Sequence, residues 1–423
     1  MKLPDSISPT SNVRRSCYSL MEDEAFDQND SISNEGYRSV ILHQQAIDNL
    51  ASKIAMSIEG RSPNPNEMVH FQSSVDECIG NLTFASWDEG SWHYNCENYT
   101  RPNSSLSDVN LQKFERIALY IMTMDAINFC FWPTNEDCAT TKNLLEYEHL
   151  AQALKKLAER DDVLDESLNL QDASVAESSY FFAPHNLASL TVQSFLDSIN
   201  PLLPETPSDS ESGEVFCIPN VAERVRLLNE LGIALQVWHS GSATKFIEKA
   251  DQSADMLVHL ILQYFTGFRD TAVDSKKGRW VAFYKRAQIL VADLWAALGN
   301  GGLGDKLEIP FCNFYDMDKI TTFADYRVPQ LLRNLGIMEY SKELGDMVDN
   351  GVEITAFCMD ELYIRSATVV AVDLLVKSVQ KLIQSDKNDI NAVKMDWFLW
   401  NVGELLDREG QLKKHHKVRT IYY

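Results

Sequence analysis

GRWVAFYKRAQILVADLW (residues 278–295) and KITTFADYRVPQLLRNLG (residues 319–336) are the two stretches around which the rest of the chain is organised. At helical pitch the first stretch is apolar on nearly every face, which predicts a buried helix. It nevertheless carries Lys285, Arg286 and Asp293. Because a buried charge needs a partner, this helix is expected to meet opposite charges or a charged ligand.

The second stretch predicts a helix that is broken at residues 327–329. A proline disfavours the helical conformation in the residue before it and can itself begin a new helix. Phe323, Asp325 and Tyr326 are therefore expected at the end of one helix, beside a tight turn into the next. A carboxylate at this junction and the Lys-Arg pair of the first stretch suit a pocket for a small anionic substrate.

The remainder of the chain predicts an all-α fold. Apolar residues recur at spacings of three and four in many segments, whereas alternating β-branched runs are nearly absent. The clearest predicted helices cover residues 37–60, 106–132, 144–157, 186–199, 221–239, 243–265, 341–348, 360–383 and 390–406. Helices of ordinary length with short turns between them indicate a single globular helical domain.

Three polar segments lack this periodicity. Residues 1–35 are rich in Ser, Asp and Asn and predict a flexible polar extension, so that the domain covers residues 36–423. Residues 160–178 are acidic and polar, and residues 201–213 are rich in Pro, Ser, Glu and Asp. Both of these segments are predicted to be exposed insertions.

The formal net charge of −23 argues against nucleic acid as the main partner, because binding to phosphate backbones depends on Lys and Arg. The same charge opposes binding to an anionic membrane.

The eight cysteines are scattered without a Cys-x-x-Cys pair, which is typical of a reduced compartment. The N-terminal residues lack the apolar run of a secretory signal, and the most apolar window, residues 367–376, is too short to cross a bilayer. A cytoplasmic monomer is expected, with the nucleus as an open alternative.

The Lys-Arg pair in the first stretch has two interpretations. A phosphate would suit both side chains, because Arg offers a planar fork of donors and Lys a point charge. Alternatively, Lys285 and Arg286 form buried ion pairs, with Asp293 or Asp325 as partners. The residues alone favour the ion pairs.

The last predicted helix also has two interpretations. Residues 396, 397, 400 and 401 fall within about 140° of one helix face. Asp396 beside Trp397 would suit a guanine-like base, because a carboxylate accepts from adjacent N–H donors and an aromatic ring stacks on the base. The alternative is an amphipathic helix that packs Trp397 or Trp400 into the core.

Other chemistry finds little support in the sequence. No group of His, Cys and Asp has metal-binding spacing, and no phosphate loop with a Lys-Ser/Thr ending or Ser-His-Asp arrangement is evident. No cofactor and no metal are therefore expected. His415 and His416 lie among lysines and are predicted to be solvated.

Several long motifs resemble the queuosine salvage protein family, whose members are queuosine 5'-phosphate N-glycosylase/hydrolases. These motifs are DAINFCFWP (125–133), FYKRAQILVADLW (283–295), TTFADYRVPQLL (321–332), MDWFLWN (395–401) and RTIYY (419–423). The resemblance extends from about residue 87 to residue 423 and keeps the motifs in the same order. It implies a fold similar to that of the helical DNA glycosylases.

The resemblance also implies roles for particular residues. Asp325, in the triplet Phe-Ala-Asp, matches the carboxylate that stabilises the developing ribosyl cation or attacks it. Lys285 is expected to bind the 5'-phosphate, together with Arg286. Phe323 and His93 are expected in the base pocket, although either can be structural.

The base-binding motif on the last helix departs from the family, and two of the departures fall on expected base contacts. Asp396 is retained, whereas Trp397 stands where relatives have Tyr and Asn401 where they have Asp. The second change removes a negative charge suited to the amine of the queuine side chain. Affinity or base preference is therefore expected to differ.

The function that the resemblance implies is hydrolysis of queuosine 5'-phosphate, which releases queuine for salvage into tRNA modification. Because queuine is a 7-deazaguanine, it has no N7 that can be protonated to ease its departure. The alternative from another class is a helical binding or scaffold protein that keeps the fold without turnover. A nucleic-acid glycosylase is a third possibility, against which the net acidity argues.

Overall fold

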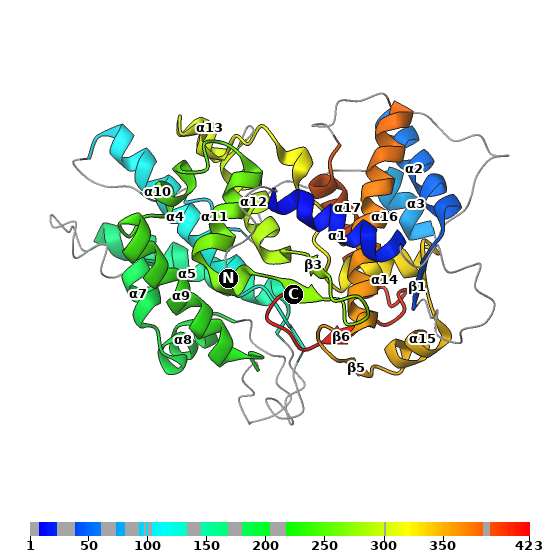
Figure 1. Cartoon of the computed structure of the whole chain (residues 1–423). Coiled ribbons are helices and arrows are strands. Elements are labelled where there is room, and N and C mark those ends of the chain that lie inside the picture. Colours follow the sequence, from blue (N-terminus) through cyan, green and yellow to red (C-terminus); the bar gives the residue numbers. More distant parts are fainter. Residues whose placement is uncertain are drawn as a thin grey trace.

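Two long buried helices, α4 (Leu106–Ala126) and α16 (Met359–Ile383), each form the centre of one half of the molecule (Figure 1). The computed structural model describes residues 8–22, 39–60, 73–80, 93–96, 99, 104–132, 145–167, 180–203, 217–299, 302–383 and 390–423. Within these ranges the structure consists of helices and three short strand pairs, so the all-α prediction is confirmed.

The elements follow one another in this order: α1 (Pro9–Glu22), β1 (Val40–Leu42), α2 (Gln44–Ile58), α3 (Ser73–Gly80), α4, α5 (Tyr147–Ser167), α7 (Pro184–Ser189), α8 (Val192–Ile199), η2 (Asn200–Leu202), α9 (Val221–His239), α10 (Ala243–Glu248), α11 (Ala254–Tyr264), η3 (Thr266–Phe268), β2 (Thr271–Val273), β3 (Trp280–Ala282), α12 (Lys285–Leu298), α13 (Leu303–Lys306), η4 (Pro310–Cys312), η5 (Met317–Lys319), α14 (Arg327–Asn334), β4 (Met338–Tyr340), α15 (Lys342–Asp349), β5 (Glu353–Ile354), α16, α17 (Ala392–Arg408) and β6 (Lys417–Val418).

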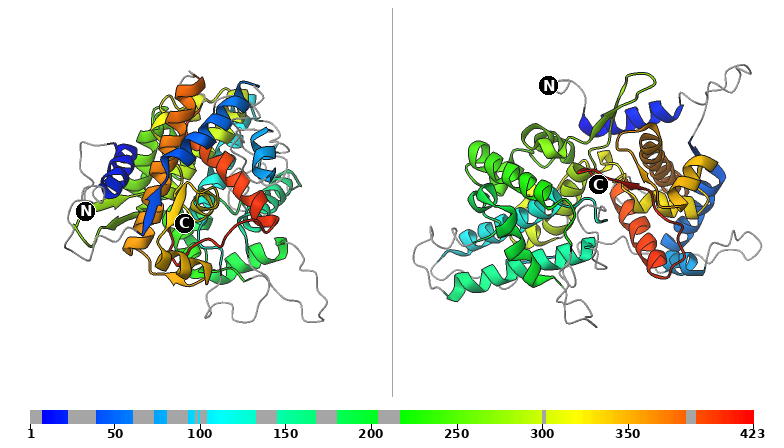
Figure 2. Two further views of the ribbon diagram at one scale, coloured as in Figure 1. Left: turned by 90° about the vertical axis from the view of Figure 1, so that its right-hand side faces the viewer. Right: turned by 90° about the horizontal axis from the view of Figure 1, so that it is seen from below.

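The first half of the molecule is built around α4. The helix begins at Ser105, whose Oγ accepts a hydrogen bond from the Asp108 N–H at 3.1 Å, and its C-terminal part is buried on all sides. α5, α9, α10 and α12 pack against it, and α7 and α8 cover α9 (Figures 1 and 2). A helix that is apolar all round needs such neighbours on every face.

The second half is built around α16, which is buried over most of its length. α1, α2, α14 and α17 pack against it (Figure 1). The antiparallel pair of β1 and β4, with Val40 opposite Tyr340, joins the start of α2 to the end of α14. The parallel pair of β5 and β6 joins the segment before α16 to the C-terminal residues.

The prediction of a flexible N-terminal extension is wrong for residues 9–22. They form α1, whose Val13, Cys17 and Leu20 are buried. α1 packs against α16 of the second half and against α11 and β3 of the first, and Figure 2 shows it lying across both. The sequence of α1 is polar enough to hide this contact, because only one narrow face is apolar.

Polar contacts fix α1 as well. The Asp255 carboxylate accepts hydrogen bonds from the Ser8 and Thr10 hydroxyls, at 2.7 and 2.6 Å. The Arg14 guanidinium pairs with Asp373 at 3.1 Å and donates to the backbone carbonyls of residues 318–320 at 2.7–3.1 Å. α1 therefore holds the segment that leads into residues 321–325.

The predicted helix over residues 278–295 begins only at Lys285. Residues 280–282 instead form β3, which pairs with β2 in an antiparallel hairpin. Tyr284 then takes a left-handed conformation, with φ 51°, and α12 starts at the next residue. Because of this break, Lys285 and Arg286 lie in the first turn of α12 and not in the middle of a longer helix.

The predicted helix before residue 327 is absent. Residues 320–324 are extended, Asp325 and Tyr326 form a bend, and α14 begins at Arg327. Asp325 thus stands at the N-terminal end of a helix and not at a C-terminal end. Such a position favours a carboxylate, since the first N–H groups of a helix lack partners within it.

Other predicted boundaries also shift. Residues 243–265 form two helices, because Asp316 accepts a hydrogen bond from the Ala254 N–H at 2.6 Å at the start of α11. The predicted insertion at 160–178 is helical as far as Ser167, and Asp162 in it forms a buried ion pair with Arg116 at 2.8 Å. Residues 168–178 and 204–213 lie outside the described residues. Cys217 is disulfide-bonded, which the sequence did not indicate.

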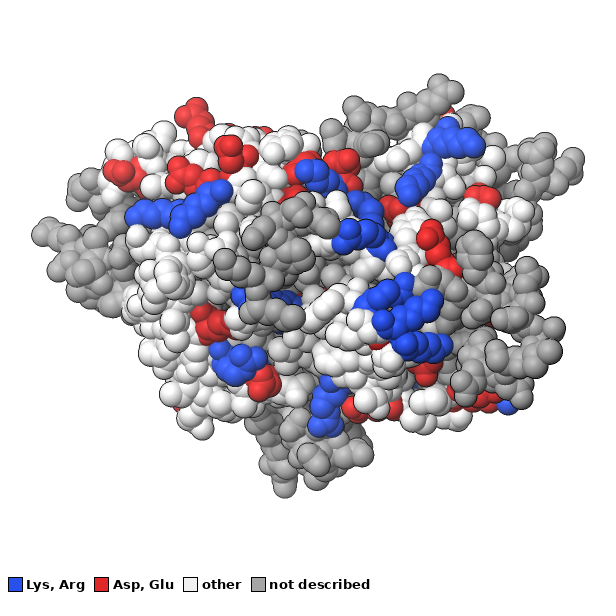
Figure 3. All heavy atoms as spheres, in the orientation of Figure 1, with Lys and Arg blue, Asp and Glu red and all other residues white. Residues whose placement is uncertain are grey.

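On the face shown in Figure 3, basic and acidic side chains lie in small separate groups. No helix of the described residues is both long and apolar enough to cross a bilayer. No cluster of three His, Cys, Asp or Glu side chains in these ranges is arranged to hold a metal ion.

Arg14→Ala should destabilise the protein, whereas the neighbouring Arg15→Ala should not. Arg14 bonds one carboxylate and three carbonyls, and a hydrogen bond to a charged group contributes about 1.5–3 kcal/mol. Arg15 is exposed and bonds only Asn12, so its loss should stay within about 0.5 kcal/mol. Urea unfolding of both variants measures this difference, and equal midpoints would contradict the docking of α1.

Candidate active site

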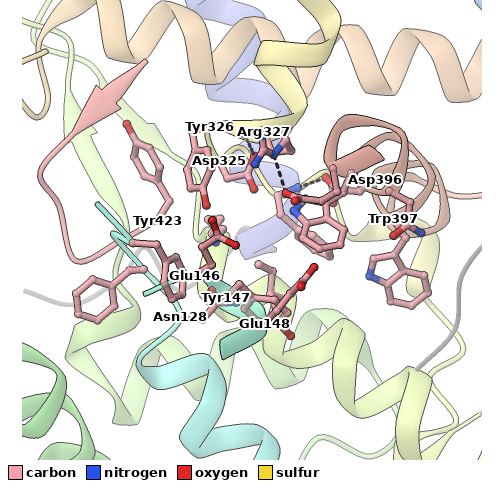
Figure 4. A pocket seen from close by; sticks show the side chains of 18 of the residues that line it. Asn128, Glu146, Tyr147, Glu148, Asp325, Tyr326, Arg327, Asp396, Trp397 and Tyr423 are labelled. Atoms are coloured by element: carbon pink, nitrogen blue, oxygen red, sulfur yellow. Dashed lines mark hydrogen bonds and ion pairs between the residues drawn. The ribbon is translucent and has the colours of Figure 1, made fainter. Parts of the chain in front are cut away.

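A cavity of about 710 Å³ lies where the two halves of the molecule meet. The first half contributes residues after α4, the start of α5 and one face of α12. The second half contributes residues 323–327, α17 and the C-terminal residues. Figure 4 shows Asp325 and Asp396 on one side of this space, with Glu146, Tyr147 and Glu148 facing them. The volume lies within the range of small-molecule sites.

The extended residues 321–324 are fixed by side chains from three helices. Gln288 of α12 accepts from the Thr321 N–H at 2.8 Å. Asp396 of α17 accepts from the Phe323 N–H at 2.9 Å, and Arg365 of α16 donates to the Ala324 carbonyl at 3.0 Å. These bonds satisfy backbone groups that a helix would otherwise pair internally, which explains why the segment stays extended.

Asp325 lines the cavity and is held in one orientation. Its Oδ1 accepts hydrogen bonds from the Arg327 and Val328 N–H groups at the start of α14, at 2.9 and 3.2 Å. Burial raises the pKa of this carboxyl, and Lys285 and the two N–H groups oppose the rise. Its Oδ2 makes no hydrogen bond to the part of the chain that the structure describes, so one oxygen is left for a ligand.

Asp396 approaches the same space from α17. Its Oδ1 accepts from the Thr322 hydroxyl and from the Phe323 N–H. Burial, and next the neighbouring Asp325, raise the pKa of Asp396 to about 8. Both effects favour the protonated form of this carboxyl near neutral pH, because burial and a neighbouring carboxylate each penalise the charged form.

Lys285 points into the cavity from the first turn of α12. Its side chain is buried, with 5% exposed, and its ammonium has no carboxylate within 4 Å among the described residues. Burial lowers its pKa, whereas Asp325, Asp125 and Asp396 act in the opposite direction. A buried ammonium without an ion pair is costly unless an anion binds it.

Arg286 does not line the cavity, which corrects the prediction that it binds the phosphate. Its guanidinium donates to the carbonyls of Asp125 and Ala126 at the end of α4, at 3.2 and 2.5 Å, and to the Gly267 carbonyl at 2.5 Å. It also packs on the ring of Phe129. Adjacent residues on a helix point about 100° apart, so Lys285 and Arg286 face different surroundings.

The remaining residues predicted to contact a base all line the cavity. Phe323 and His93 are buried, and His93 Nε2 lies 3.2 Å from the Tyr147 hydroxyl. Trp397 stacks on Trp295 with centroids 6.1 Å apart. Asn401 lies one turn further along α17 and is exposed.

The sequence did not single out the residues after α4 as part of the site. Asn128, Phe129, Phe131 and Trp132 line the cavity. Their backbone is held by Arg224, which donates to the carbonyls of residues 127, 129 and 130. The only signal in the sequence was the motif DAINFCFWP, whose role as a cavity wall depends on an arginine almost 100 residues away.

The C-terminal residues and the start of α5 were also missed. His415 and Tyr423 line the cavity together with Glu146, Tyr147 and Glu148. The prediction that His415 is solvated is wrong: it packs on Tyr326 with centroids 4.7 Å apart, and burial lowers its pKa to about 4.

His416 is buried too, with 1% of its surface exposed, so its predicted solvation is also wrong. Burial lowers its pKa to about 3. The ring centroids of His416 and Tyr423 lie 6.0 Å apart, and Tyr423 lines the cavity.

Ion pairs account for part of the charge in the cavity. Arg327 binds Glu404 at 2.7 Å and Asp407 at 2.9 Å, and Arg408 binds Glu148. α14 can approach α17 this closely because Gly403 has no side chain. A Cβ at this position would lie only 3.0 Å from the Arg327 side chain. Lys285 and Lys417 are the lining cations without such a pair among the described residues.

The fold and the cavity define a helical protein with an acidic and aromatic cavity of a size that suits a small molecule. The chain belongs to the queuosine salvage protein family, whose pattern matches residues 109–423. The family resemblance of the motifs is thereby confirmed.

Curated relatives of this chain have the same name in several organisms. The queuosine 5'-phosphate N-glycosylase/hydrolase of Dictyostelium discoideum is 35% identical over 338 residues, which cover 80% of this chain and 85% of that protein. The protein of the same name from Sphaerobacter thermophilus is 34% identical, covering 73% and 82%. That of Bos taurus is 32% identical, covering 72% and 81%.

Proposed function

We propose that this chain hydrolyses the N-glycosidic bond of queuosine 5'-phosphate and releases queuine and ribose 5-phosphate. The observation that carries the proposal is the buried ammonium of Lys285, which has no ion pair among the described residues and shares the cavity with Asp325 and Asp396. Such a site offers one contact for a phosphate, one carboxyl for a base edge and one for the sugar. The family and the names of the relatives support the same reaction.

The two ends of the substrate are bound by different elements. Lys285 takes the 5'-phosphate at the start of α12. Asp396 accepts from the N–H donors of the guanine-like edge, and Phe323 and Trp397 contact the faces of the base. Binding energy from the phosphate then helps to position the sugar between these contacts.

Asp325 acts at the sugar. Cleavage of a glycosidic bond passes through an oxocarbenium-like state, and a fixed carboxylate stabilises that cation. The two N–H groups of α14 hold one oxygen of Asp325 in place, which leaves the other for the anomeric carbon. Because a 7-deazaguanine has no N7 to protonate, the leaving base depends on hydrogen bonds to its edge. Water completes the reaction at the ribosyl centre.

The alternative is a binding protein with this fold and no turnover. Incubation of the purified protein with queuosine 5'-phosphate, followed by mass spectrometry of free queuine, separates the two. Release of queuine in proportion to protein concentration supports the hydrolase, and tight binding without release overturns it. We further propose that the protein is a monomer that acts in the cytoplasm. Its substrate is this nucleotide and not nucleic acid.

Asp325→Asn should abolish most turnover while base binding and stability are retained. The amide oxygen can still accept from the two N–H groups of α14, but it stabilises a cation poorly. Loss of such a preorganised electrostatic contact costs about a hundredfold or more in rate. Single-turnover kinetics and calorimetry with queuine measure both properties, and a rate within a few-fold of wild type would remove Asp325 from the mechanism.

Lys285→Ala should impair hydrolysis of the 5'-phosphate much more than hydrolysis of the nucleoside. A lost contact to a charged group corresponds to about ten- to a hundredfold in catalytic efficiency. Lys417→Ala is the matched control, because Lys417 also lines the cavity but is partly exposed on β6. If the control loses phosphate discrimination and Lys285→Ala does not, the phosphate site lies at the C-terminal residues instead.

The affinity for 7-deazaguanine should rise with pH up to about 8 and then level off. The base edge needs an ionised Asp396 carboxylate. Without a ligand, burial and the neighbouring Asp325 raise the pKa of this carboxyl to about 8. Binding therefore releases a proton. Below that pKa the affinity rises by about tenfold for each unit of pH. Calorimetry across this range should show the slope in wild type and its loss in Asp396→Asn; a flat wild-type profile would show that the base does not bind the carboxylate.

A further inference from the structure

One face of α12 presents Lys285, Ile289, Asp293 and Ala296 to the cavity. Lys285 and Asp293 are eight residues apart, which corresponds to about 12 Å along the helix axis. The two opposite charges thus face the same space from one rigid element. Asp293 is only partly buried, because its carboxylate opens to the cavity.

Asp293 has no polar partner in the part of the chain that the structure describes. Within the ranges that the structure describes it forms no hydrogen bond and no ion pair, whereas Glu148, Glu404 and Asp407 at the same cavity are all bound by arginines. Burial raises the pKa of Asp293 to about 7, and Lys285 opposes the rise. A cation brought by a ligand would relieve this cost, because an opposite charge favours the ionised carboxylate.

Aromatic rings line the same cavity as this carboxylate. Tyr147 and Trp400 line the cavity edge to face, with centroids 6.2 Å apart, and Phe131 lies 6.4 Å from Tyr147. Burial, and next the charge of Asp293, raise the pKa of the Tyr147 hydroxyl, and both side chains line the cavity. A carboxylate together with aromatic faces is the combination that binds ammonium groups in proteins.

Two other positions that line the cavity are less suited to bind a buried cation. Glu146 lines the cavity but is exposed, so solvent and salt screen its charge. Asn401, on α17 beside Trp400, is neutral. Asp325 and Asp396 are already engaged by the sugar and the base edge in the proposed reaction.

We propose that Asp293, with Tyr147 and Trp400, forms a subsite for a protonated amine on the substituent of the base. The subsite makes the cavity selective for a zwitterionic nucleotide, with the phosphate at Lys285 and the ammonium at Asp293. This inference rests on the proposed function, since queuosine 5'-phosphate carries an aminomethyl group on its 7-deazaguanine. Asp293 is then a specificity residue and takes no part in bond cleavage.

The test compares queuine with 7-deazaguanine, which lacks the amine, by calorimetry. Asp293→Asn should weaken queuine binding by about tenfold or more, as expected for a lost hydrogen bond to a charged group, and leave 7-deazaguanine nearly unchanged. Glu146→Gln is the matched control and should change neither ligand by more than about twofold, because exposed charges contribute little. Trp400→Leu should reproduce the selective loss in smaller measure, which keeps the test valid if Asp293→Asn folds poorly.

The outcomes separate this inference from the proposed function. Equal loss for both ligands in Asp293→Asn, or a selective loss in Glu146→Gln instead, overturns the subsite even when turnover of queuosine 5'-phosphate is normal. If the wild-type protein prefers queuine to 7-deazaguanine but releases no queuine from the nucleotide, the proposed hydrolase function is wrong and the proposed subsite is supported. Equal wild-type affinity for the two ligands overturns the subsite.

Discussion

The buried ion pair between Arg365 and Asp270 connects the elements that form the site. Two guanidinium nitrogens of Arg365 bind the Asp270 carboxylate at 2.9 and 2.5 Å, and both side chains are almost fully buried. Arg365 also holds the Ala324 carbonyl, next to Asp325, while Asp270 accepts from the N–H of Lys285 at 3.2 Å. The pair thus fixes the relative position of the carboxylate and the ammonium in the cavity. Removal of one partner from such a pair costs about 3–5 kcal/mol, because the other charge is left buried alone.

An acidic protein can bind a phosphate because the local charge inside the cavity differs from the charge of the whole protein. The formal charge is −23, yet the wall at the start of α12 presents a buried ammonium without an ion pair. The protonated form of Asp396 nearby is favoured near neutral pH, so the cavity carries less negative charge than its composition indicates. Burial thereby reduces the repulsion that the sequence alone would predict.

Regular helices with apolar periodicity were predictable from the sequence, and segments held by distant side chains were not. The apolar period of the sequence locates α4 within the predicted residues 106–132, and the same period places α9 and α16 nearly at their observed bounds. The helices expected over residues 278–284 and 319–326 are wrong because Asp270, Gln288 and Asp396 bind the backbone there. Local propensity does not contain such contacts.

The sequence by itself determined the helical class, the family and the residue types of the site, because these depend on periodicity and on motifs that are contiguous in the chain. It placed Lys285, Phe323, Asp325 and Asp396 in one functional set, and the cavity brings them together. Only the tertiary structure decided that Arg286 faces away, that α1 docks on the body and that Asp293 faces the cavity. The reason is that these outcomes depend on contacts between residues far apart in the chain, such as the 95 positions that separate Asp270 from Arg365.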